Sequence, residues 1–175
     1  MTSKKILILS SIFIISLSIP LYVFGKKLGI FNPQLKPVSG DWANPAHRVG
    51  EKPKTTWTDT TLEAAINKKP LEGKLTTRIG EVIDVSCYLQ LGKHGVEHVE
   101  CAKKCILSGQ PVGLLEEDGT VYMLIPEEHH PRRDGKTVLA SALAEHVGQI
   151  VEVTGTLTNV KGLKTLFIQG FVKKE

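Results

Sequence analysis

The chain has 175 residues, 41% of them hydrophobic and 23% charged, which excludes a disordered or collagen-like protein and leaves room for one ordinary domain with appendages. The formal net charge of +4 belongs to the N-terminal part: residues 1–72 hold 10 Lys and Arg against 5 Asp and Glu, whereas residues 73–175 hold 12 against 13. A nucleic-acid-binding domain carries its basic residues on the folded module, so this distribution argues against nucleic acid as a partner.

Residues 1–27 have the pattern of an export segment. Lys4 and Lys5 precede an apolar run over 6–24, and Lys26 and Lys27 follow it. The run is close to the ~20 residues that a helix needs to span a bilayer. We expect residues 6–24 to anchor the protein in the inner membrane and to leave the rest on the periplasmic face of the cell envelope. A cleaved signal peptide is the alternative.

Residues 28–72 are predicted to be a polar connector, because prolines recur there and no apolar period develops. Trp42 and Trp57 are expected to pack on the surface of the following domain. Within this region, residues 59–70 predict a short helix that is capped by Asp59, Thr60 or Thr61 and lies against that domain.

Residues 73–175 are predicted to be the folded domain. From Leu75 the sequence alternates with a period of two, which indicates a strand whose odd-numbered residues face inward and which ends at Cys87. Gly80 is expected to form a bulge in this strand. Two further apolar runs are joined through Asp118-Gly119, a hairpin signal. A helix over 137–146, a strand over 150–158 and a last strand over 163–172 complete the domain.

The predicted order is strand, insert, strand, strand, helix, strand, strand. This order matches a mainly β fold: a five-stranded OB-fold-like Greek-key barrel with a helix between strands 3 and 4. The insert between strands 1 and 2 is rich in cysteine and histidine, and we expect it to be helical.

The domain resembles a group of small exported bacterial OB-fold proteins of unknown function. The matching residues are Gly80-Glu81-Val82-Ile83-Asp84, Cys87, Gly92, His98, Cys101-Ala102, Cys105, Gly109, Pro111 and Gly113-Leu114-Leu115. The architecture alone is also similar to the haem chaperone of cytochrome c maturation, an OB domain on an N-terminal anchor. That family attaches haem through a C-terminal histidine, and no histidine follows His146 here. These resemblances imply the fold and export, and no activity.

All three cysteines of the chain lie within residues 87–105, at the end of the first strand and in the insert that follows it. If residues 95–107 are helical, His98, Cys101 and Cys105 share one face within about 60°. Cys87, at the inward end of the first strand, would then meet them. Three thiolates and one imidazole suit zinc, and cuprous copper would accept the sulfurs. The sequence therefore predicts a metal site of Cys87, His98, Cys101 and Cys105, with His94 as an additional candidate ligand.

Two other interpretations of the cysteines stay open. Cys87 could form a disulfide with Cys101 or Cys105, since thiols oxidise outside the cytoplasm. Alternatively, the cysteines are reduced and serve as small core residues. As a separate variant, an odd thiol near His98 would be a nucleophile or redox centre. His129-His130 beside two glutamates is a weaker metal candidate, and His47 and His146 are expected to be isolated.

No phosphate-binding loop, serine-hydrolase motif or zinc-peptidase motif occurs, so we expect a binding module rather than an enzyme. Its expected partners are the membrane, through the N-terminal segment, and an envelope protein. The alternatives are a thiol-redox protein and a disulfide-stapled assembly module of an envelope complex.

Overall fold

The computed structural model describes residues 35–127 and 138–170, and the chain from Pro37 onward forms one compact unit. The predicted anchor over 6–24 and the pair His129-His130 lie outside the described residues. Within the two described ranges, no helix combines the length and hydrophobicity that crossing a membrane requires.

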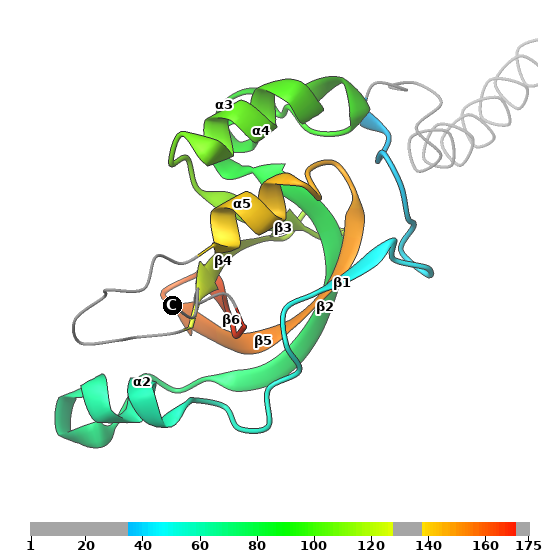
Figure 1. Cartoon of the computed structure of the whole chain (residues 1–175). Helices are drawn as coiled ribbons and strands as arrows, with labels where there is room; N and C mark the ends of the chain where they lie inside the picture. The colour runs from blue at the N-terminus through cyan, green and yellow to red at the C-terminus, as the bar shows by residue number, and fades with distance from the viewer. Residues whose placement is uncertain (1–34, 128–137, 171–175) are drawn as a thin grey trace, which may run out of the picture. The chain divides into compact units, whose positions relative to one another are not determined.

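Five strands close into a barrel (Figure 1). Their order around it is β5-β2-β3-β4-β6, and β6 pairs back onto β5. The β4–β6 pair is parallel and the other four barrel pairs are antiparallel. The strands are β2 (Lys74–Asp84), β3 (Val112–Leu115), β4 (Val121–Pro126), β5 (Ile150–Val160) and β6 (Leu163–Ile168). This topology confirms the predicted OB-fold-like barrel.

Helices occupy the two predicted places in this order. Helix α5 (Leu139–Ala144) lies between β4 and β5. The insert between β2 and β3 consists of α3 (Val85–Leu91), a short 3-10 turn η3 (Val96–His98) and α4 (Val99–Leu107). Helices α3 and α4 lie together at one end of the barrel, next to α5 (Figure 1).

Local sequence signals explain several of these elements. Gly119 has φ 88°, the left-handed conformation that a Gly supplies without strain, and it sits in the turn of the β3–β4 hairpin. In β5, Val151 and Val153 are completely buried, while Glu152 and Thr154, which alternate with them, are partly exposed. The sequence predicts that Val151, Val153 and Leu157 share the inward face, and the first two are buried as expected. The pattern is wrong further along the strand, where Thr156 is 1% exposed and Leu157 is only partly buried.

Two glycines let neighbouring strands approach closely. A Cβ on Gly155 would lie 2.3 Å from the carbonyl oxygen of Phe167, and a Cβ on Gly80 would lie 2.7 Å from Leu114 Cγ. The predicted bulge at Gly80 is wrong: β2 pairs with β5 without interruption from Lys74↔Leu157 to Glu81↔Ile150. The small residue serves close packing there, because the opposing side chain fills the space of the missing Cβ.

The predicted inward face of β2 is also wrong. Val82, an even-numbered residue, belongs to the central core, whereas the odd-numbered Thr77 is exposed. All five residues from Gly80 to Asp84 are buried. Both faces of this strand end are covered, so burial no longer alternates with a period of two from Gly80 to Asp84.

The predicted connector contributes a sixth strand. His47–Val49, β1, pairs in parallel with β5, and Val49 is buried in the core. Trp57 packs edge-on against Phe167, with ring centroids 5.4 Å apart, and its Nε1 donates to the carbonyl oxygen of Leu71. Trp57 therefore packs on the domain's own surface, as expected.

The short helix predicted over 59–70 forms as α2 (Asp59–Ala64) followed by a 3-10 turn, Ile66–Lys68. Its N-cap is Thr58. The apolar stripe that was expected to lie against the barrel does not: α2 has no buried residue, and Ile66 is 86% exposed. The link to the barrel is polar instead, because one carboxylate oxygen of buried Glu127 accepts hydrogen bonds from Thr58 and Thr61.

Candidate metal centre

Asp84 is the last residue of β2, and the insert begins directly after it. Its Oδ1 accepts the backbone N–H groups of Ser86 at 2.9 Å and of Cys87 at 3.3 Å, which makes it the N-cap of α3. Gly92, with φ 67°, ends the helix in the left-handed conformation. Cys87 thus lies in the first turn of α3, and the prediction that it ends the first strand is wrong.

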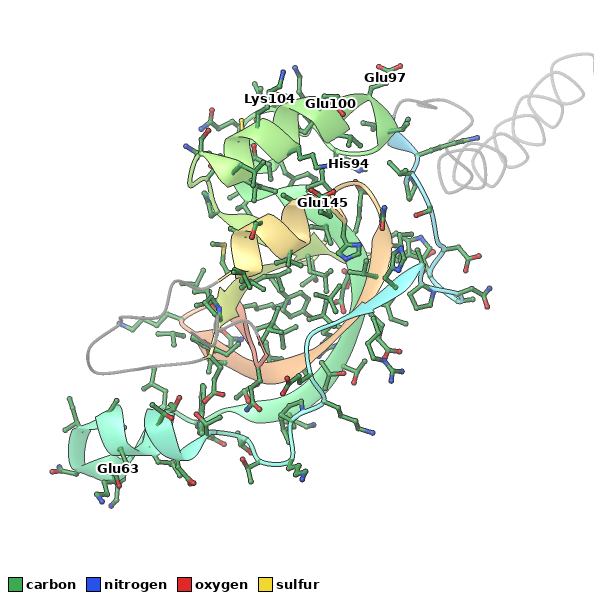
Figure 2. The ribbon with its side chains drawn as sticks, viewed as in Figure 1. Glu63, His94, Glu97, Glu100, Lys104 and Glu145 are labelled. Carbon is green, nitrogen blue, oxygen red and sulfur yellow. The ribbon has the colours of Figure 1, made fainter. Side chains whose placement is uncertain are left out.

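Helix α4 is amphipathic and packs on the barrel through Ala102 and Ile106, each 1% exposed. Glu97, Glu100 and Lys104 lie on the outer side of the insert, away from the barrel (Figure 2). Cys101 and Cys105 are one helical turn apart, at the border between these two sides, with Cys101 exposed and Cys105 partly buried.

Three sulfur atoms meet between α3 and α4. The Sγ atoms of Cys87, Cys101 and Cys105 all lie within 4.8 Å of one another, and we call these residues the outer group. A zinc–sulfur bond of ~2.3 Å places the sulfurs of a tetrahedral site about 3.8 Å apart, so a small contraction of this group is enough to hold an ion. All three thiols are free, without a disulfide.

A second group of ligand atoms shares Cys87. Single ligand atoms of Asp84, Cys87 and His98 also lie within 4.8 Å of one another, and we call these residues the inner group because Asp84 and His98 are both buried. The four predicted residues are thus distributed over two groups: the cysteines meet one another, and His98 joins Cys87 beside a carboxylate.

Two polar atoms of the inner group are unsatisfied. Asp84 Oδ2 and His98 Nε2 are buried and have no hydrogen-bond partner. Leaving a buried donor or acceptor without a partner costs ~1–3 kcal/mol each. Such atoms in a native fold have a partner that is an ordered water or an ion, and a cation is one partner that would suit both a carboxylate oxygen and an imidazole nitrogen.

The local environment favours the neutral form of the Cys87 and Cys105 thiols. Burial, together with the nearby Asp84 carboxylate, raises the pKa of Cys87 to about 11. Burial and the same carboxylate also raise the pKa of Cys105. The pKa of His98 is lowered, chiefly by burial, which favours the neutral imidazole that metals bind. A cation in place of the thiol protons would convert the Asp84 charge from unfavourable to favourable.

His94, the additional candidate ligand, belongs to neither group. Its Nδ1 lies 2.9 Å from Glu81 Oε2, and Glu81 Oε1 accepts the backbone N–H of Gly95 at 2.7 Å. The rings of Tyr88 and His94 are in edge contact at 5.8 Å. Both oxygens of buried Glu81 are therefore satisfied, and the pair joins the insert to β2.

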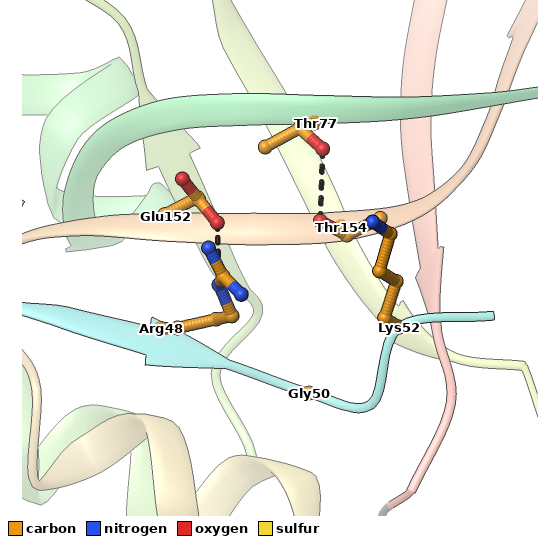
Figure 3. Close-up of a pocket in the computed structure, with 6 residues that line it drawn as sticks. All are labelled: Arg48, Gly50, Lys52, Thr77, Glu152 and Thr154. Carbon is orange, nitrogen blue, oxygen red and sulfur yellow. Dashed lines mark hydrogen bonds and ion pairs between the residues drawn. The ribbon is translucent and has the colours of Figure 1, made fainter.

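The other polar sites among the described residues are weaker candidates for a functional site. A hollow of about 220 Å³ beside β1 and β5 is lined by Arg48, Gly50, Lys52, Thr77, Glu152 and Thr154 (Figure 3). Its Arg48 and Glu152 form an ion pair at 2.5 Å, and the Thr77 and Thr154 hydroxyls bond to each other at 2.9 Å. His47 and His146, expected to be isolated, have ring centroids 4.8 Å apart.

Sequence reasoning missed Asp84 as a candidate ligand. The alternation of β2 assigned this residue to the solvent face, yet it is completely buried. The available signal was its position three residues before Cys87, where an Asp both caps a helix and faces the side chains of the first turn.

Comparisons of the chain with protein-family models, with curated proteins and with solved structures gave no match.

Proposed function

We propose that this chain is an exported binding module that holds a transition-metal ion in the thiolates of Cys87, Cys101 and Cys105. The observation that carries the proposal is the meeting of three free sulfur atoms within 4.8 Å of one another. They come from two helices that are separate in sequence, so their convergence requires the insert to be docked on the barrel end.

The ligand set favours zinc or cuprous copper. Thiolates select soft or borderline ions, and zinc and Cu(I) both accept a three-sulfur environment. Exposed Cys101 gives an incoming ion access to the outer group. The OB-fold-like barrel supplies the rigid support for the insert that carries the sulfurs.

Export and anchoring are proposed from the N-terminal sequence. The apolar run over 6–24 between two lysine pairs supports an anchor in the inner membrane, with the barrel in the periplasm. Carbonate extraction of membranes, with protease added to spheroplasts, tests this. An anchored periplasmic domain stays in the pellet and is digested, whereas a protease-protected domain contradicts the proposal.

The thiol-redox alternative is less well supported, because a reactive cysteine needs a lowered pKa and the pKa values of Cys87 and Cys105 are raised. A disulfide would join two of three mutually adjacent sulfurs and leave one thiol over. Metal binding uses all three sulfurs, and for this reason we prefer it.

The test is Cu(I) binding by the full chain in competition with a chelator of known affinity. Cys101→Ser and Cys105→Ser should each weaken binding by at least ~10–100-fold, because replacing a residue that only hydrogen-bonds to a metal ligand already causes a loss of this size. Lys104→Ala, an exposed change on the same helix, is the control and should bind as wild type. Equal affinities for wild type and Cys101→Ser would refute the proposal.

A further inference from the structure

The inner group has features that a three-thiolate site does not explain. Asp84 is completely buried and His98 is 6% exposed, and each has one polar atom without a hydrogen-bond partner. One ligand atom of each lies within 4.8 Å of the Cys87 sulfur and of the other. They come from different elements, the end of β2 and the turn η3, so no local turn or cap accounts for their meeting.

The capping role of Asp84 accounts for only half of its carboxylate. Oδ1 accepts two backbone N–H groups, while Oδ2 has no partner. Glu81, three residues earlier on the same strand, is the natural comparison: its two oxygens are taken by Gly95 and His94. The fold therefore satisfies one buried carboxylate completely and leaves one oxygen of the other without a partner, in a residue that lies close to a histidine and a cysteine.

We infer that Asp84, Cys87 and His98 form a second, inner metal position, specific for a borderline divalent cation of the zinc class, which shares the Cys87 thiolate with the outer position. One oxygen, one nitrogen and one sulfur are ligands that zinc accepts together, whereas cuprous copper prefers the sulfur-rich outer group. The inference rests on the proposed function and assigns a different kind of ion to each of the two positions.

Cobalt(II) is the probe for the inner position, because it takes zinc sites and its absorption spectrum reports sulfur ligands. Cys101→Ser breaks the outer group and leaves every inner residue in place. This variant of the full chain should still bind one equivalent of Co(II), with a weaker sulfur charge-transfer band than a three-thiolate site gives. Adding His98→Gln should abolish the binding, and adding His47→Gln, the matched histidine control, should leave it unchanged.

The reciprocal experiment uses Cu(I). Since the three thiolates remain intact, His98→Gln alone should keep a Cu(I) affinity within about threefold of wild type. Asp84→Asn provides a second inner variant that keeps an oxygen for the cap of α3. Circular dichroism establishes that each variant is folded. Asp118→Asn, in the exposed β3–β4 turn, is the control for Asp84→Asn.

The outcomes separate the two proposals. Cu(I) binding by wild type, together with no Co(II) binding by folded Cys101→Ser, overturns the inner position and leaves the proposed function standing. If the double variant with Cys101→Ser and His98→Gln binds Co(II) as well as Cys101→Ser alone, the inner position is also overturned. A wild-type protein that binds neither ion refutes both proposals.

Discussion

Glu81 and His94 join the helical insert to the barrel: the Oε2 of the buried carboxylate lies 2.9 Å from the imidazole Nδ1, and its Oε1 accepts the N–H of Gly95. A carboxylate only accepts hydrogen bonds, so Nδ1 carries the proton. Glu81 lies three residues before Asp84, and His94 lies four residues before His98. We therefore expect the geometry of the candidate metal centre to depend on this contact, although neither Glu81 nor His94 belongs to a ligand group.

Replacing this carboxylate should loosen the insert. Glu81→Ala leaves the buried Gly95 N–H and the His94 ring without their acceptor, and we expect a loss of ~2–3 kcal/mol in the free energy of unfolding. Urea denaturation measures the loss. Glu63→Ala, which removes an exposed pair with Lys68, is the control and should change the stability by less than ~0.5 kcal/mol. A Glu81→Ala protein as stable as the control would show that the contact is not needed.

The reactivity of the thiols should follow their exposure and pKa. In metal-free protein at pH 7, an alkylating reagent should modify exposed Cys101 first and Cys87 slowly, because a thiol with a pKa of about 11 is almost entirely protonated there. The Cys87 rate should rise with pH until about pH 11. Peptide mapping by mass spectrometry after timed quenching measures each site.

Asp84→Asn extends this experiment. The neighbouring carboxylate contributes to the raised pKa of Cys87, so removing its charge should lower that pKa and speed alkylation at pH 8. Asp118→Asn, remote from the cysteines, should leave the rate unchanged. Fast labelling of Cys87 at pH 7 in wild type would contradict the electrostatics and favour the thiol-redox alternative.

Closure of the barrel should depend on Gly155. Gly155→Ala would place a Cβ 2.3 Å from the Phe167 carbonyl oxygen, and relief requires β5 and β6 to separate. We expect a loss of at least ~1–3 kcal/mol, the usual cost of overpacking. Thermal unfolding measures it, with Lys74→Ala at the exposed start of the neighbouring strand β2 as control. A thermal midpoint equal to that of the control would contradict the close approach.

Glu127 should hold the segment before β2 on the barrel. Glu127→Ala removes the acceptor of the Thr58 N–H and of the Thr58 and Thr61 hydroxyls, and α2 buries no side chain that could replace this contact. We expect proteolytic cleavage within 51–72 to become faster while the barrel stays intact. Exposed Glu72→Ala serves as control, and unchanged cleavage in Glu127→Ala would show that other contacts hold the segment.

The barrel could be predicted because its signals are local. The Asp118-Gly119 turn and the alternation of Val151 and Val153 each depend on a few neighbouring residues. Strand β1 was missed because three residues without an apolar pattern become a strand only through pairing with β5. Tertiary pairing of this kind leaves no periodic signal in the sequence.

The candidate site could be predicted only in part. The clustering of Cys87, Cys101 and Cys105 follows from their positions in one insert, and the structure brings them together. His98 joins Cys87 and not the group of three sulfurs, since α4 begins at Val99 and His98 belongs to the preceding turn. Asp84 was overlooked because the insert covers a strand face that a period of two assigns to solvent.

The central claim is that the three cysteines hold a metal ion rather than a disulfide. Elemental analysis combined with a free-thiol count, on protein recovered from its native compartment, tests this most directly. The account predicts at least one zinc or copper ion per chain and, after denaturation with a chelator, three titratable thiols from the three cysteines of the sequence. Metal-free protein with a single titratable thiol would contradict it and establish a disulfide.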